Sequence, residues 1–159
     1  MTIIKNGQTE ASSWLHLADE PLPSNGAVTL SLERWLKDKT ELSARDGEVG
    51  VRLNAADSVE TLADDLASLS LVVLDMASFT DGRAFSQARL LRDRFGYSGE
   101  IRARGDFLRD QMFFLSRVGV NAFEFPDQTR LDDRLRAFNE FSVTYQSAAD
   151  SPEPLYRRR

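Results

Sequence analysis

The chain has 159 residues, of which 42% are apolar and 28% charged, and it contains no cysteine and one histidine, His16. A chain of this length and composition is typical of a globular domain whose core needs no disulfide or metal. The composition excludes iron–sulfur ligation, a thiol nucleophile and multi-histidine metal sites, and a Ser-His-Asp triad would have to use His16. We therefore expect no metal centre.

The net charge of −5 conceals an uneven distribution of charged residues. Residues 1–82 carry 6 basic and 14 acidic side chains, whereas residues 83–117 carry 8 arginines and 4 acidic side chains. A negative total argues against a nucleic-acid or anionic-membrane binder, and the arginines suit either carboxylate partners on the surface or a bound oxyanion. The chain has no apolar run of membrane-spanning length and begins without a signal-peptide pattern, which predicts a cytoplasmic protein.

Strand and helix patterns alternate along most of the chain. Residues 2–17, around the turn signal Asn6-Gly7, predict an irregular strand pair or hairpin. Further strands are predicted at residues 27–32, 50–53, 71–75, 100–104 and 120–125. Helices are predicted at residues 32–42, 58–69, 81–95, 107–118 and 130–141.

Several residues mark the expected helix ends. Asp57 or Ser58 is expected to cap the helix at residues 58–69, and Asp106 the helix at residues 107–118, because short acceptor side chains satisfy the free N–H groups of a first turn. Gly96 and Gly119 are expected to end the helices before them in left-handed conformations.

These elements predict an α/β fold with a mainly parallel sheet, because each crossover is long enough to return the chain parallel to itself. The sheet is either open and doubly wound or curled like part of a barrel, since periodicity does not distinguish the two. Residues 1–145 are expected to form a single domain. The polar, proline-broken tail at residues 146–159 is expected to be mobile.

A ligand site is expected at the carboxyl ends of the parallel strands, where the following helix N-termini also lie and favour anions. The candidate site residues come from the segments that follow two of the strands, together with the arginines of the strand at residues 100–104. They are Thr80, Asp81, Gly82, Arg83, Gln87, Arg102, Arg104, Asp106, Arg109, Asp110 and Gln111. The alternatives for Arg83 are a carboxylate partner or a simple capping box with Asp81.

Arg102 and Arg104 alternate with Ile101 and Ala103 in a strand that should be apolar if both faces are covered. If this is an edge strand, the arginines are solvated. If it is internal, they must pair with a ligand anion or with carboxylates, since an unpaired buried charge is very costly. The candidate partners are the carboxylates of Asp75, Asp106 and Glu124.

Several other functions lack their motifs. The chain has no Gly-x-Gly-x-x-Gly fingerprint and no phosphate-binding loop, and no lysine after Lys39 to serve a receiver-type domain. Strand-end carboxylates, including Asp81, are more often helix caps or arginine partners than magnesium ligands. The helix at residues 107–118 is apolar over most of its circumference, which predicts burial on several sides, in the core or against another subunit such as a second copy.

Residues 79–125 resemble the signature block of an uncharacterised bacterial family whose genes neighbour those of assimilatory sulfite reductase and whose members are sometimes labelled oxidoreductases. The resemblance is carried by Thr-Asp-Gly-Arg, Ser-Gln-Ala-Arg-Leu-Leu-Arg and Arg-Asp-Gln at fixed separations. The family pattern points to Asp81, Gly82, Arg83, Ser86, Gln87, Arg89, Arg92, Arg102, Gly105, Asp106, Arg109, Asp110 and Gln111. The chain departs from the pattern at residues 76–78, which lack an expected lysine, and at Val118, which replaces a cysteine or similar residue.

This resemblance implies an accessory protein of assimilatory sulfate or sulfite reduction that binds a small oxyanion, or an acidic group of a partner such as sulfite reductase, at the arginine-lined strand ends. Two alternatives are an oxidoreductase or transferase acting on a sulfur-containing anion, and a structural docking partner of a reductase. The resemblance identifies no cofactor.

Overall fold

The computed structural model describes residues 1–139, 144–150 and 153–157. Its centre is an eight-stranded sheet in the order β2-β1-β8-β7-β6-β5-β4-β3. The strands are β1 (Thr2–Lys5), β2 (Gln8–Ala11), β3 (Leu15–His16), β4 (Val28–Ser31), β5 (Val49–Leu53), β6 (Leu71–Met76), β7 (Glu100–Gly105) and β8 (Ala122–Glu124).

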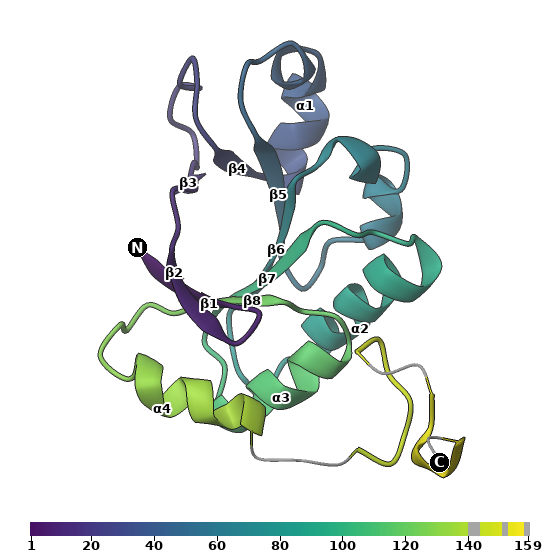
Figure 1. The fold of residues 1–159 in the computed structure, drawn as a ribbon. Helices are drawn as coiled ribbons and strands as arrows, with labels where there is room; N and C mark the ends of the chain where they lie inside the picture. Colours follow the sequence, from purple (N-terminus) through teal and green to yellow (C-terminus); the bar gives the residue numbers. More distant parts are fainter. Residues whose placement is uncertain (140–143, 151–152, 158–159) are drawn as a thin grey trace.

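The sheet is mostly parallel and strongly curled. Strands β3 to β8 pair in parallel, each beside its neighbour in sequence, and β1 joins β8 and β2 in antiparallel orientation. A doubly wound sheet requires a reversal of strand order that this sheet lacks. Of the two sheet shapes left open by the sequence, the structure has the partial barrel (Figure 1).

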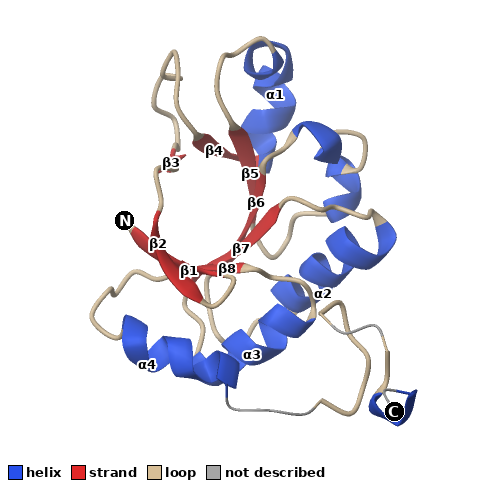
Figure 2. Cartoon of the chain, viewed as in Figure 1, coloured by secondary structure: helices blue, strands red, loops and turns tan. Residues whose placement is uncertain are grey.

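The two edge strands of the sheet are consecutive in the chain. Only residues 12–14 separate β2 from β3, so this short segment passes from one edge of the curled sheet to the other (Figure 1). The four α-helices found in the described residues lie on the outer side of the curl, and none of them covers the β2–β3 side in this view (Figure 2). The inner face is therefore enclosed by the sheet and this segment rather than by helices.

The helices are α1 (Leu32–Ser43), α2 (Arg83–Arg89), α3 (Arg109–Arg117) and α4 (Leu131–Leu135). A π-helical turn at Leu90–Arg94 extends α2, and Gly96 follows with φ +61°, as predicted for a helix stop. Gly119 likewise has φ +106° after α3. The predicted hairpin is confirmed, because β1 and β2 pair around Asn6 and Gly7 at positive φ.

The helix predicted at residues 58–69 is wrong. The segment forms two separate 3₁₀ turns, Val59–Leu62 and Leu66–Ser68. The expected cap Asp57 instead accepts a hydrogen bond from the Asn54 backbone, and neither turn has a side-chain cap. The apolar residues of the segment are nevertheless buried as their spacing predicts. Val59, Leu62, Leu66 and Leu69 all belong to the core.

Helix α3 begins later than predicted, and Asp106 is not its cap. Leu108 occupies the N-cap position, and the Gln111 side chain accepts from its backbone N–H at 2.9 Å. The helix is also less enclosed than predicted: Met112 and Leu115 are buried, but Leu108 and Phe114 are 47% and 53% exposed.

The closing helix is shorter than predicted. A 3₁₀ turn at Arg136–Asn139 follows α4, and the end of the predicted element at residues 140–141 lies outside the described residues. In the described part of the tail, the Ala149 N–H donates to the Arg117 carbonyl. No described helix has the length and apolar character needed to cross a membrane.

The two faces of the sheet differ in chemistry. Ile101 and Ala103 of β7 belong to the hydrophobic core beneath the helices, together with Val72 and Leu74 of β6. The alternate residues of β7, including Arg102, point to the inside of the curl, because successive side chains of a strand face opposite sides. The curled sheet thus separates an apolar outer layer from a charged interior.

Candidate functional site

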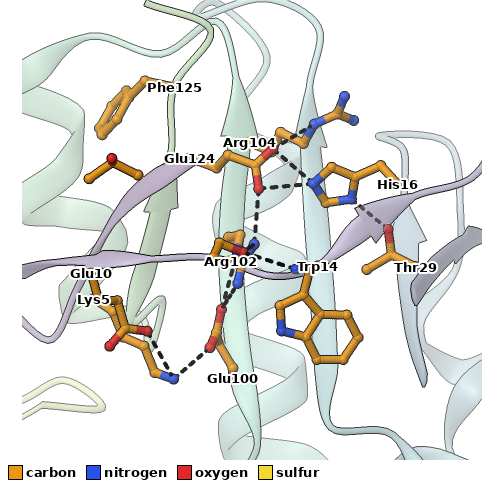
Figure 3. Close-up of polar contacts among 12 residues, drawn as sticks. Lys5, Glu10, Trp14, His16, Thr29, Glu100, Arg102, Arg104, Glu124 and Phe125 are labelled. Atoms are coloured by element: carbon orange, nitrogen blue, oxygen red, sulfur yellow. Dashed lines mark hydrogen bonds and ion pairs between the residues drawn. The ribbon is translucent and has the colours of Figure 1, made fainter. Parts of the chain in front are cut away.

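Glu124 is the centre of the charged interior (Figure 3). It lies on β8, and its side chain is 2% exposed. Three basic side chains surround the carboxylate: Arg102 at 3.0 Å, Arg104 at 3.1 Å and His16 at 2.9 Å. Strand register explains the two arginine contacts. Glu124 pairs with Arg104 in the β7–β8 ladder, and Arg102 lies two residues before Arg104, on the same face of β7.

Arg102 is 1% exposed and is held by two carboxylates. Its Nη1 donates to Glu124 Oε2 and to Ser12 Oγ, both at 3.0 Å, while its Nε donates to Glu100 Oε1 at 2.8 Å. Glu100 also pairs with Lys5 at 2.8 Å. Arg102 therefore lies on an internal strand with carboxylate partners, which is the second of the two situations expected for it from the sequence.

His16 reaches Glu124 from β3, on the other side of the curl (Figure 3). Its Nε2 lies 2.9 Å from both carboxylate oxygens, and its Nδ1 lies 2.5 Å from Thr29 Oγ1. A carboxylate only accepts hydrogen bonds, so the proton is assigned to Nε2. The bond joins β3 to β8, which are far apart in the sheet order.

A pocket of about 360 Å³ opens at the carboxyl ends of β5 to β8. Its polar lining comes from Asn54, Asp75, Arg104 and Glu124. Its other walls are Met1, Ala55, Met76, Ala77, Gly105, Phe125 and Pro126. The volume is at the lower end of the range for small-molecule sites. We call it the strand-end pocket.

Arg104 supplies the cationic side chain of the strand-end pocket. Its Nη1 donates to Asp75 Oδ1 at 3.0 Å, and its Nε lies 3.1 Å from Glu124 Oε1. Its side chain is 37% exposed, and within the described residues its Nη2 makes no hydrogen bond. One edge of this guanidinium is therefore available to a ligand.

Two pKa shifts show how burial and charge compete in the interior. Burial raises the pKa of Glu124, but the hydrogen bonds and charges of His16 and Arg102 outweigh it and hold the pKa below its ordinary value. Burial also lowers the pKa of Arg52, although Asp75 opposes this effect. Arg52 donates to the Leu17 carbonyl at 2.6 Å, and its Nε lies 4.0 Å from Asp75 Oδ2.

The structure distributes the predicted site residues over four places. Arg104 lines the strand-end pocket, and Arg102 lies in the charged interior. Asp81 and Gln87 line a very small adjoining hollow that shares Asp75 with the pocket. Six predicted residues lie outside both linings, in the exposed loops or the first turn of a helix: Thr80, Gly82, Arg83, Asp106, Asp110 and Gln111. Arg109, on the first turn of α3, is also outside them.

Some of these residues have structural partners. Arg83 pairs with Asp81 at 2.7 Å and is 63% exposed, which is one of the alternatives noted for it. Gln87 Nε2 donates to the carbonyls of Asn54 and Asp57. Gln111 Nε2 donates to the Phe79 carbonyl at 2.8 Å, so it ties together the loops that precede α2 and α3.

The sequence interpretation assigned no site role to His16 or Arg52. His16 lies in a strand of only two residues, too short for a periodic signal. Arg52 did carry a signal: it is a charged residue inside the short strand that includes Val51 and Leu53, as Arg102 is in its own. Arg52 and Arg102 both lie in register with Val73 of β6, the strand between theirs, so the two arginines are on the same face of the sheet.

The fold and the site define an α/β protein with a curled, mainly parallel sheet, a charged interior and a pocket at the strand ends. Residues 50–156 match the family model described as a bacterial protein of unknown function (DUF934), and the chain belongs to this family. No curated protein gives a significant match to the sequence. The matched range begins at the second residue of β5 and runs through β6, β7 and β8, so it includes the carboxyl ends of all the strands that line the pocket.

Within the described residues, no group of three or more histidine, aspartate or glutamate side chains is arranged to hold a metal ion. The carboxylates of Asp75 and Glu124 are instead engaged with arginines. The chemistry that this arrangement offers is the binding of charged groups by Arg104 and Asp75 at the pocket surface.

Proposed function

We propose that this protein binds a small oxyanion, or an acidic group of a partner protein, in the strand-end pocket, and that it serves as an accessory protein of assimilatory sulfate or sulfite reduction. The observation that carries the binding proposal is the position of Arg104, a guanidinium with an unused edge at a metabolite-sized pocket. The sulfur context rests on the resemblance of residues 79–125 to their family's signature block.

The surroundings of Arg104 favour this role. Its Nε and Nη1 are held by Glu124 and Asp75, so the group is fixed before a ligand arrives and loses little side-chain entropy on binding. An oxyanion would accept a hydrogen bond from the remaining Nη2, and such charge-assisted bonds are stronger than neutral ones. Sulfate, sulfite and phosphate are all small enough for the pocket.

A thermal-shift titration with sulfate, sulfite and phosphate tests this proposal. A ligand that binds only the folded state stabilises it by about 1.4 kcal/mol at ten times its Kd, which raises the melting temperature by about 3–6 °C. Because sulfate also stabilises proteins by exclusion from their surface, the comparison is made with variants. We expect Arg104→Gln to lose the anion-specific shift and Arg94→Gln to retain it.

Arg94 is a suitable control because its side chain is 62% exposed, pairs with Glu60 and does not line the pocket. An equal response of the wild type and both variants to every anion would show that the pocket does not bind these ions.

A docking role is the second candidate, because Leu108 at the N-cap of α3, Phe114 of α3 and Phe79 in the loop before α2 are 44–53% exposed. Large aromatic and apolar side chains are enriched in the buried core of protein interfaces. Sedimentation with purified sulfite reductase tests this role. If docking is the function, Phe114→Ser weakens the complex and Arg104→Gln does not.

An oxidoreductase or transferase acting on a sulfur-containing anion is the remaining candidate. The carboxylate of Asp75, 33% exposed beside Arg104, is the group in the pocket that would move a proton. The absorbance spectrum of the purified protein tests the redox form of this proposal, since a bound flavin or haem absorbs visible light.

A further inference from the structure

We propose that the ligand of the strand-end pocket is a small zwitterion of the amino acid type, whose carboxylate binds Arg104 and whose ammonium group binds Asp75. This inference rests on the proposed function, because it uses the same pocket and the same arginine, and it adds the chemical class of the ligand. The juxtaposition that carries it is a pair of opposite charges, Arg104 and Asp75, side by side at the pocket surface.

Each member of this pair has unused capacity. Arg104 Nη2 makes no hydrogen bond within the described part of the chain. The same holds for Asp75 Oδ2, whose ion-pair partner Arg52 lies 4.0 Å away, beyond hydrogen-bond distance. The pocket therefore offers the two N–H groups of Arg104 Nη2 as open donors. Next to them, Asp75 Oδ2 is an open acceptor.

The charge balance of the interior favours a ligand that carries both signs. The cations Lys5, Arg52, Arg102 and Arg104 are matched by the carboxylates of Glu10, Asp75, Glu100 and Glu124. A simple anion at Arg104 would face Asp75 and Glu124 at short range, and like charges repel. A zwitterion adds no net charge. Its ammonium group is attracted by the Asp75 carboxylate, which repels a simple anion.

The remaining walls define the rest of the ligand. Met76, Phe125 and Pro126 provide apolar surface beside the charged pair. A volume of about 360 Å³ accommodates an aliphatic side chain together with the charged groups. A neutral amino acid with an aliphatic side chain has all the required parts.

Calorimetric titration of the full chain with three matched compounds tests the inference: L-leucine, 4-methylpentanoate, which lacks the amino group, and 3-methylbutylamine, which lacks the carboxylate. We expect leucine to bind about tenfold more tightly than either of the others, a difference of about 1.4 kcal/mol. Equal binding of leucine and 4-methylpentanoate would overturn the inference and leave the proposed anion site intact.

Variants show whether the charged pair is responsible. Asp75→Asn should remove the preference for leucine over 4-methylpentanoate, Arg104→Gln should weaken both, and Arg94→Gln should change neither. Both pocket side chains are about one-third exposed, so the variants should fold, which circular dichroism checks. A leucine preference that survives Asp75→Asn would overturn the inference.

Parallel titrations with sulfate separate the two proposals. Sulfate binding that needs Arg104, without leucine binding, would overturn the zwitterion and support the proposed function. Leucine binding without sulfate binding supports the zwitterion and excludes a simple inorganic anion as the ligand. Binding of neither would overturn both assignments of this pocket.

Discussion

Arg102 and Glu124 form an ion pair of 3.0 Å inside the curled sheet, where their side chains are 1% and 2% exposed. They lie on neighbouring strands, and each has a second charged partner, Glu100 for Arg102 and Arg104 for Glu124. Buried charges stabilise a protein only while each keeps its partners. The attraction between the partners offsets the free energy that is lost when each charge is removed from water.

Replacing Glu124 by glutamine should therefore be strongly destabilising. The substitution keeps the size of the side chain but leaves Arg102, Arg104 and His16 without their shared carboxylate. Removing one partner of a buried pair costs about 3–5 kcal/mol. Urea unfolding measures the loss.

The matched control is Asp93→Asn. Asp93 pairs with Arg89 on the exposed surface of the π-helical turn, where an ion pair contributes about 0–1 kcal/mol. Similar losses in the two variants would mean that the interior network contributes no more than a surface pair.

The same carboxylate should make stability depend on acid pH. The pKa of Glu124 is lowered in the folded protein, whereas its ordinary value is 4.5. The stabilisation is therefore complete above about pH 4.5 and is lost as the pH falls through the folded-state pKa. Urea unfolding at several pH values should show a shallower acid loss in Glu124→Gln than in the wild type. Identical pH profiles would exclude Glu124 as the source.

The sequence predicted the outer layer of this fold better than its interior. Strand and helix periodicity located β4 to β8, because their apolar residues face a continuous core. A partial barrel differs from an open sheet in the curl of the sheet. The curl depends on the strand order and on the connection of β2 to β3 by residues 12–14. Neither leaves a periodic signal.

The candidate site was found in part. Alternation of Arg102 and Arg104 with apolar residues indicated a charged face, and of the three candidate partners Asp75, Asp106 and Glu124, the ion pairs confirm Asp75 and Glu124. The contribution of His16 was not predictable from local pattern, because it reaches Glu124 across 108 positions of sequence. The helix N-termini predicted that Arg83 belongs to the ligand site, but Arg83 pairs with Asp81 two residues away.

Gly105 should tolerate no side chain at the end of β7. Its φ is +118°, and a Cβ atom there would lie 2.3 Å from the Met76 carbonyl oxygen on β6. Gly105→Ala should cost about 2–4 kcal/mol through backbone strain and separation of the two strands. Thermal and urea unfolding measure the cost, and binding at Arg104 should weaken as well.

Gly82→Ala provides the comparison, because Gly82 has φ −81° and open space around its Cβ position. We expect its stability to change by less than about 1 kcal/mol. An equally small change at Gly105 would contradict the close approach of β6 and β7 at this point.

Trp35 and Asp65 provide a test of packing outside the curl. Trp35 of α1 is 2% exposed, and its Nε1 donates to Asp65 Oδ2 at 2.9 Å; the other oxygen of Asp65 pairs with Lys39 at 2.5 Å. Asp65→Ala leaves the buried indole N–H without its acceptor, which should cost about 1–3 kcal/mol. Unfolding followed by tryptophan fluorescence measures the cost directly.

A double-mutant cycle isolates this contact from the rest of the Asp65 environment. In a Trp35→Phe background no indole N–H remains, so Asp65→Ala should cost less than it does in the wild type, by about 1 kcal/mol. Asp65→Asn keeps an acceptor oxygen and should cost less than Asp65→Ala in the wild-type background. If Asp65→Ala costs the same with and without the indole, the stability of this region comes from the Lys39 pair and from packing, not from the hydrogen bond of Trp35.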